Sequence, residues 1–188
     1  RENIDQEYYC DIILEEAEAM QEKVERLLEL SYMEFGMGEL KKECLDFAEL
    51  LEHQLDVSKV LLEQKHLKLE VEKEPCAFMG NRVYLASVIS NYFSNAVKYS
   101  PEGGTIKVRL IAAPDSVIFR IFNQGPHIAP EDQENIWESF YQADKSHSKQ
   151  GTGLGLYIVR KIVELHQGTY GMKNVEGGVE FFVTLPRA

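Results

Sequence analysis

The chain has 188 residues, of which 44% are hydrophobic and 27% are charged, and its formal net charge is −11. This composition indicates a globular protein of one ordinary domain with an appended segment, and it excludes an intrinsically disordered chain. The negative net charge argues against a nucleic-acid partner, because binding a phosphate backbone requires a basic surface.

The first 36 residues predict one long helix whose apolar side needs a partner. Residues 3–34 contain neither glycine nor proline. A coiled-coil-like seam with alternating steps of three and four residues runs over about three heptads; it consists of Cys10, Ile13, Ala17, Met20, Val24, Leu27 and Ser31. One helix cannot bury this seam, so we expect a partner helix from a second copy of the chain, from a preceding segment, or from both. A core helix of the same domain is the alternative, which a flexible glycine joint at 36–38 disfavours.

Residues 39–188 predict a second unit of the α+β class. Helices are expected at 47–64, 91–100 and 154–167, with a short helix near 131–140. Strands are expected at 43–46, 67–71, 76–79, 106–110, 117–123, 170–174 and 179–185, because apolar and polar residues alternate in several of these segments. This mixed order predicts a two-layer α/β sandwich, with helices on one face of a mixed, mostly antiparallel sheet.

The segment 91–100 has the strongest chemical pattern. Read as a helix, it groups Asn91, Asn95 and Lys98 on one face, with Tyr99 beside them and apolar residues opposite. A carboxamide oxygen suits Mg²⁺, an ammonium suits phosphate, and an aromatic ring suits a base. Together these groups predict a metal-nucleotide site, and an ordinary solvated helix face is the alternative.

Two further motifs have a chemistry that suits a nucleotide. The segment 151–156 (Gly-Thr-Gly-Leu-Gly-Leu) opens a helix, where backbone N–H groups point at phosphates. It matches neither the Walker loop nor the dinucleotide fingerprint, so taken alone it fits a hinge or a helix cap equally well. Asn123 ends a strand before Gly125, and its amide can accept from an adenine amino group and donate to the neighbouring ring nitrogen.

In this order the motifs resemble the nucleotide-binding domain of bacterial sensor histidine kinases, which are GHKL ATPases. Residues 91–100 resemble the N box, 123–128 the G1 box, 136–140 the F box and 151–156 the G2 box. The resemblance covers nearly all of 39–188 and implies the ATP-binding catalytic domain with the GHKL fold. Residues 1–36 are similar to the second helix of the family's dimerisation and histidine-phosphotransfer domain.

The resemblance also implies ATP and Mg²⁺ as cofactors and assigns roles to individual residues. Asn91, Lys98 and Lys145 become the catalytic candidates, and Asn95 becomes the Mg²⁺ ligand. Residues 142–150 become a mobile lid from which Lys145, with Lys149 as a second candidate, reaches the γ-phosphate. The implied nucleotide-binding residues are Asn91, Asn95, Lys98, Tyr99, Asn123, Gly125, Ile128, Phe140, Lys145, Gly151, Thr152, Gly153, Leu154, Gly155 and Leu156.

Three departures from the family pattern modify these expectations. No histidine has the acidic neighbour and downstream proline of the phosphoacceptor, so self-phosphorylation is not expected; the five histidines are expected on surfaces or in loops. Asn123 replaces the usual Asp, and His127 replaces a usual Gly. The Asn123 amide is neutral and can flip to exchange its donor and acceptor, which predicts weaker discrimination between ATP and GTP than an Asp would give. Asn91 stands where hydrolysing relatives carry Glu, so ATP hydrolysis should be slow.

The resulting hypothesis is a protein-histidine kinase domain of a two-component system. It would transfer the γ-phosphoryl group of Mg·ATP to a histidine of a dimerisation domain, from which a response regulator would receive it. A homodimer is expected for the full-length protein. A regulatory nucleotide-binding module with little catalytic power is the alternative, and a serine-directed kinase of the anti-sigma-factor type or a hydrolysing ATPase is a third hypothesis.

The sequence also predicts where the chain resides. It has no signal peptide and no apolar run long enough to span a bilayer, and its three cysteines are widely spaced. A cytoplasmic location is therefore expected, with a membrane anchor in the full-length protein.

Overall fold

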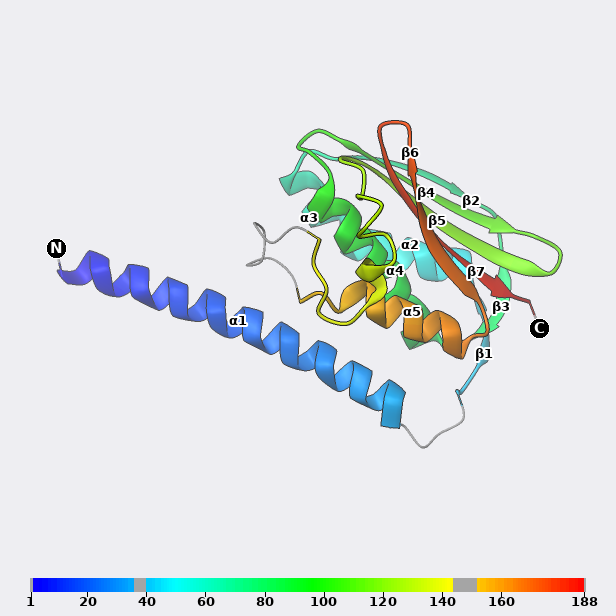
Figure 1. Ribbon diagram of the computed structural model, residues 1–188, viewed down its shortest axis with the longest axis horizontal. Coiled ribbons are helices and arrows are strands. Elements are labelled where there is room, and N and C mark those ends of the chain that lie inside the picture. Colours follow the sequence, from blue (N-terminus) through cyan, green and yellow to red (C-terminus); the bar gives the residue numbers. More distant parts are fainter. Residues whose placement is uncertain (1, 36–39, 144–151, 188) are drawn as a thin grey trace. The chain divides into compact units, whose positions relative to one another are not determined.

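The computed structural model describes residues 2–35, 40–143 and 152–187. The chain divides into two compact units, Arg1–Met37 and Gly38–Ala188. The first contains the helix α1 (Glu2–Phe35), drawn in blue in Figure 1. Its seam residues Ile13, Met20 and Val24 are exposed. These side chains of the heptad seam are thus not buried within α1's own unit, and the predicted glycine joint falls outside the described residues.

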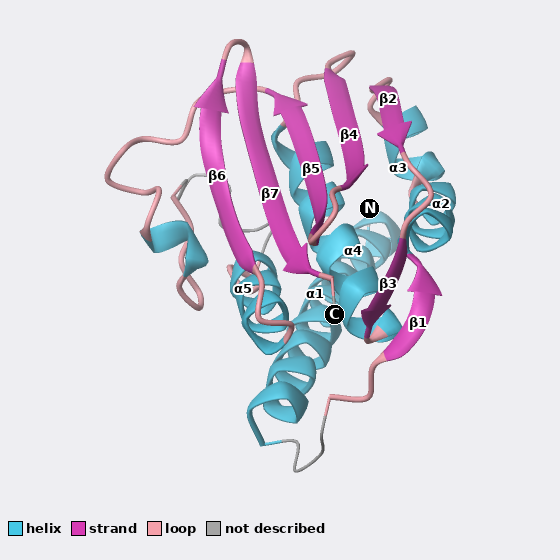
Figure 2. Ribbon diagram, turned by 90° about the vertical axis from the view of Figure 1, so that its right-hand side faces the viewer, coloured by secondary structure: helices cyan, strands magenta, loops and turns pink. Residues whose placement is uncertain are grey.

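The second unit is built on a five-stranded sheet with the order β2-β4-β5-β7-β6 (Figure 2). Only the β2–β4 pair is parallel among these neighbours, which confirms a mixed, mostly antiparallel sheet. A second, two-stranded antiparallel sheet joins β1 (Glu43–Asp46) to β3 (Ala77–Gly80). The strands of the large sheet are β2 (Lys68–Lys73), β4 (Thr105–Ala112), β5 (Ser116–Gln124), β6 (Thr169–Val175) and β7 (Gly178–Pro186).

Helices of the second unit cover one face of the large sheet (Figures 1 and 2). Along β5, Val117, Phe119 and Ile121 are buried, because successive strand residues point to opposite faces. No described helix has an apolar stretch long enough to cross a bilayer. The helices are α2 (Phe47–Val57), α3 (Lys59–Gln64), α4 (Arg82–Tyr99) and α5 (Gly155–Leu165).

Aromatic side chains fill the core between α4 and the sheet. The Tyr92 ring stacks on Phe119 with centroids 6.2 Å apart, and its hydroxyl donates to the Phe182 carbonyl at 3.1 Å. Burial raises the pKa of Tyr92 well above its ordinary value. Truncation of the fully buried Phe119 to Ala should lower the free energy of unfolding by about 3–5 kcal/mol. This packing fixes the rotation of α4 about its axis.

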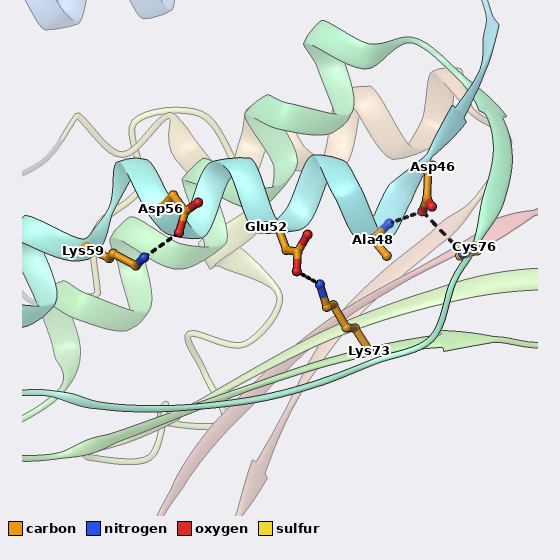
Figure 3. Close-up of polar contacts among 7 residues, drawn as sticks. All are labelled: Asp46, Ala48, Glu52, Asp56, Lys59, Lys73 and Cys76. Carbon is orange, nitrogen blue, oxygen red and sulfur yellow. Dashed lines mark hydrogen bonds and ion pairs between the residues drawn. The ribbon is translucent and has the colours of Figure 1, made fainter.

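Polar contacts attach α2 to the strands beside it (Figure 3). Asp46 caps α2, because its Oδ1 accepts the N–H of Ala48 at 2.8 Å, and it also accepts the N–H of Cys76 at 3.5 Å. Glu52 of α2 forms an ion pair with Lys73 of β2. The start of α2 and its middle are therefore both held to neighbouring strands.

The structure differs from the sequence expectation mainly in four elements. One is α4, which begins at Arg82 and not near residue 91, because Asn81 caps the helix there. The predicted helix 47–64 is interrupted at Ser58, whose hydroxyl donates to the Gln54 carbonyl at 2.9 Å; such local bonding competes with a continuous helix. The predicted helix near 131–140 is reduced to the 3₁₀ turn η1 (Asn135–Trp137). The strand expected at 67–71 runs over Lys68–Lys73, and its Val71 is 39% exposed at the edge of the sheet.

Candidate functional site

The N-box residues lie on α4, which has a well-defined start. The Asn81 Oδ1 accepts the N–H of Tyr84 at 3.0 Å, so Asn81 caps the helix. Its apolar side, including Phe93 and Ala96, is buried as predicted. The predicted site residues of α4 do not belong to this apolar side; they are Asn91, Asn95, Lys98 and Tyr99.

Asn91 is held inside the domain. It is 5% exposed, and its Nδ2 donates to the Ser87 carbonyl at 2.8 Å and to the Ser87 Oγ at 3.1 Å. Asn95, one turn further on, is half-buried. A simple solvated helix face is therefore wrong for Asn91, because its carboxamide is oriented by its own helix.

The end of α4 combines a cation with an aromatic ring. Lys98 is half-buried, and its ammonium lies 5.0 Å from the centroid of the Tyr99 ring. Tyr99 is 42% exposed. A cation–π attraction of about 0.5–1 kcal/mol is usual at an exposed site. This arrangement offers an ammonium and a flat ring at the same helix end.

The turn after β5 lies directly against this helix end. Asn123, the last buried residue of β5, is 4% exposed, and its Nδ2 donates to the Gln124 carbonyl at 3.4 Å. A Cβ atom on Gly125 would stand 2.6 Å from the Tyr99 carbonyl oxygen, so only glycine allows this approach. The structure thus brings the predicted base-contacting residues Tyr99, Asn123 and Gly125 together.

The same turn is attached to β6 by a residue that sequence reasoning missed. Asn174 accepts the N–H of Ile128 at 3.0 Å through Oδ1, and its Nδ2 donates to the Ile128 carbonyl at 2.8 Å. The Nε2 of His127 lies 2.8 Å from the Val175 carbonyl. No local sequence motif indicates this role of Asn174, because its partner Ile128 is 46 residues away in sequence.

The F box (136–140) and the glycine turn (151–156) are joined by a backbone hydrogen bond. Phe140 is 63% exposed, and its N–H donates to the Gly153 carbonyl at 2.9 Å. The start of the next helix is organised by the Leu154 N–H, which donates to the Thr152 Oγ1 at 3.2 Å. Leu154 itself is buried, whereas Gly155 and Leu156 are half-buried in the first turn of α5.

The segment leading away from Phe140 is anchored by Tyr141. The Tyr141 hydroxyl donates to the Asp132 Oδ1 at 2.5 Å, and this hydrogen bond raises the pKa of Tyr141. The predicted lid at 142–150 is described only as far as Ala143. Lys145, Lys149 and Gly151 lie outside the described residues, so their roles stay predictions.

One histidine contradicts the expected surface position. His166 is 1% exposed; its Nδ1 lies 2.8 Å from the Ile162 carbonyl, and its Nε2 accepts the N–H of Asn81 at 3.2 Å. These two partners require a neutral ring with the proton on Nδ1. Burial lowers the pKa of His166, which agrees with the neutral form. His166 therefore links the end of α5 to the start of α4.

A separate hollow of about 290 Å³ contains none of the predicted site residues. It lies on the sheet face opposite the helices, since Lys107 and Arg109 alternate along β4 with the buried Ile106 and Val108. Its lining residues are Lys107, Arg109, Arg120, Phe122, Val175, Glu176 and Glu180. The nucleotide chemistry is instead gathered at the helix ends and turns described above.

The fold and the order of its motifs define a nucleotide-binding domain of the two-layer ATPase class. Residues 80–188, more than half of the chain, match the family of histidine kinase-, DNA gyrase B-, and HSP90-like ATPases. The chain belongs to this family. Among its relatives and structural neighbours it corresponds to the ATP-binding catalytic domain of a sensor histidine kinase.

Two curated relatives illustrate the match. The sensor protein kinase PmrB of Pseudomonas aeruginosa is 37% identical over 125 residues, which are 65% of this chain and 26% of PmrB. The sensor histidine kinase CusS of Escherichia coli K12 is 32% identical over 175 residues, which are 92% of this chain and 36% of CusS. The chain thus spans only about a third of the length of such relatives, between 26% and 36% in these two.

Solved structures agree with the fold. The catalytic domain of the histidine kinase ThkA is 27% identical with a TM-score of 0.73, and the match covers 79% of this chain and 97% of that one. The Acinetobacter baumannii histidine kinase AdeS is 26% identical with a TM-score of 0.79, covering 94% of this chain and 83% of that one.

Proposed function

We propose that the chain binds Mg·ATP between α4, the turn after β5 and the glycine turn, and presents the γ-phosphate to a histidine of a dimerisation domain. One observation carries the proposal: the close approach of Gly125 to the Tyr99 carbonyl, where a Cβ would stand at only 2.6 Å. This close approach places the turn after β5, which carries the groups suited to a base, against α4, which carries the groups suited to phosphate and metal. In this assignment Asn123 reads the base, Tyr99 lines it, and Lys98 contacts phosphate.

The donors on α4 fit Mg²⁺. This ion keeps several waters and shares its shell with substrate phosphates, so it needs only one or two protein oxygens. The half-buried Asn95 offers a carboxamide oxygen next to the phosphate-binding Lys98, with the buried Asn91 one turn away. When bound, the ion neutralises charge on the phosphate oxygens.

Asn91 favours transfer to a protein over hydrolysis. A residue that activates water must accept a proton, and a carboxamide does not do so near neutral pH. The Nδ2 of Asn91 is bonded to Ser87, which holds the side chain in place. The remaining contributions to catalysis are orientation of the nucleotide and electrostatic stabilisation by Lys98 and the glycine turn.

The partners are proposed from the relatives and from α1. PmrB and CusS are sensor kinases, and the neighbour ShkA, 25% identical with a TM-score of 0.83 over 98% of this chain, was solved in complex with AMPPNP. The exposed seam of α1 supports its assignment as the second helix of a dimerisation domain in a homodimer. A response regulator would then accept the phosphoryl group from the histidine.

Phosphotransfer in trans tests the proposal. The chain is incubated with Mg·ATP and a purified dimerisation domain from CusS, and phosphohistidine on that domain is measured by mass spectrometry. The expected result is a phosphorylated dimerisation domain, lost with Asn95→Ala and retained with Ser90→Ala, an exposed residue of the same helix. Steady release of phosphate from Mg·ATP without any acceptor would instead favour the hydrolysing ATPase. Nucleotide binding without transfer to this or a cognate domain would favour the regulatory module.

A further inference from the structure

The last turn of α4 is completed by a lysine from another part of the chain. A helix leaves its final carbonyl groups without partners inside the helix. In α4, the Lys65 ammonium donates to the Val97 carbonyl at 2.8 Å and to the Lys98 carbonyl at 2.9 Å. The Ala96 carbonyl accepts the N–H of Ser100 at 3.0 Å and its Oγ at 2.7 Å. Side chains therefore satisfy several carbonyls at this helix end.

Lys65 is itself held in place from two sides. It is the C-cap residue directly after α3, and it is half-buried. Its carbonyl accepts the N–H of Gly103 at 3.1 Å, in the loop that follows α4. The ammonium thus reaches the helix end from a backbone that is fixed to the same region, and a cation suits the negative end of a helix.

We propose that Lys65 is a positioning residue for the nucleotide site, an inference that rests on the proposed function. Lys65 acts through the turn that carries Lys98 and Tyr99 and does not touch the nucleotide itself. Without its ammonium, two carbonyls of a part-buried turn lose their partner, and the turn loosens. The Lys98 ammonium and the Tyr99 ring then lose their fixed positions, as does the contact between the Tyr99 carbonyl and Gly125.

Calorimetric titration of the whole chain with Mg·ATP tests this role. Lys65→Met should weaken binding about tenfold, which equals about 1.4 kcal/mol, because the turn loses hydrogen bonds from a charged donor. Lys65→Arg should retain most of the affinity, because a guanidinium also donates to carbonyls. The matched control is Lys59→Met: Lys59 is exposed on α3 and pairs with Asp56 at 2.7 Å (Figure 3). It should bind like the wild type.

A double-mutant cycle separates positioning from general destabilisation. If Lys65 acts through the last turn, the loss caused by Lys65→Met should be much smaller in a Lys98→Ala background. An equal loss in both backgrounds, or wild-type binding by Lys65→Met, would overturn the proposal. Absence of Mg·ATP binding by the wild type would contradict the proposed function, and this role with it.

A measurement on the wild type keeps the test independent of the folding of Lys65→Met. Lysine acylation by a slow amine reagent is followed by mass spectrometry with and without Mg·ATP. Nucleotide binding should tighten the last turn of α4 and slow the acylation of Lys65 severalfold, while Lys59 reacts at an unchanged rate. Equal effects of Mg·ATP on both lysines would contradict the coupling.

Discussion

The main chains of Phe140 and Gly153 are in direct contact. The Phe140 N–H donates to the Gly153 carbonyl at 2.9 Å, and both residues have a positive φ, 64° and 68°. A Cβ on Gly153 would stand 2.7 Å from the Phe140 carbonyl carbon. The F box and the glycine turn are therefore one structural unit, held by backbone atoms on either side of residues 144–151.

This contact predicts a specific cost for Gly153→Ala. A side chain at this φ is strained by about 1–3 kcal/mol, and the Cβ also collides with the Phe140 backbone. We expect a lower free energy of unfolding in urea and weaker Mg·ATP binding by calorimetry. Gly103→Ala is the control, because its φ is 70° but nothing lies within 4 Å of the added Cβ. It should weaken Mg·ATP binding much less than Gly153→Ala does, and equal effects of the two substitutions on binding would contradict the account.

Asn123→Asp should sharpen the choice of base. A hydrogen bond to a charged group contributes about 1.5–3 kcal/mol, against about 0.5–1.5 kcal/mol for a neutral one, and a carboxylate cannot reverse its donor and acceptor. The wild type is expected to discriminate weakly between ATP and GTP, and the variant to prefer ATP more strongly. Competition titrations of both nucleotides measure the ratio. An unchanged ratio would show that Asn123 does not read the base.

Asn174→Ala should release the turn after β5 from β6. Two neutral hydrogen bonds to Ile128 are lost, at about 0.5–1.5 kcal/mol each. The free energy of unfolding should fall accordingly, and Mg·ATP affinity should fall with it because the turn bears Gly125. Asn135→Ala is the control, since its exposed amide donates to the Glu131 carbonyl at 2.8 Å and hydrogen-bonds to Tyr141, and neither partner belongs to the turn after β5. If Asn174→Ala loses stability but keeps its full affinity for Mg·ATP, the two hydrogen bonds between Asn174 and Ile128 do not position the site.

His166 should make the stability of the domain depend on pH. Burial lowers its folded-state pKa below the unfolded value of 6.5, so the unfolded chain binds the proton first as the pH falls. The contribution of the neutral ring is complete above pH 6.5 and is lost as the pH falls through the folded-state pKa. Urea unfolding across this window should show a decline that His166→Gln reduces and that His53→Gln, at an exposed position, leaves unchanged. The same decline in all three proteins would exclude His166 as its source.

Local patterns in the sequence predicted the regular part of this fold. Alternation along 106–110 predicted a strand, in which Ile106, Val108 and Leu110 are buried, and the apolar spacing in 91–100 predicted the buried side of α4. The break at Ser58 was not predicted, because the apolar spacing continues through 47–64. The break depends on a hydrogen bond from the Ser58 hydroxyl to the Gln54 carbonyl.

The site was predicted less completely than the fold. Asn91, Asn95, Asn123 and Gly125 could be proposed from the sequence because each belongs to a short motif, and their roles stay predictions. Asn174 and Lys65 belong to none: they act through backbone atoms that are distant in sequence, so only the tertiary structure reveals them.

Calorimetric titration with ATP, ADP and GTP, each with and without Mg²⁺, tests the central claim most directly. The account predicts Mg²⁺-dependent binding of adenine nucleotides that Asn95→Ala abolishes and Ser90→Ala preserves. It predicts this because Asn95 is the proposed metal ligand and Ser90 is an exposed residue on the same helix. No binding by the folded wild-type chain, or binding that is indifferent to Mg²⁺ and to Asn95, would contradict the assignment of this site.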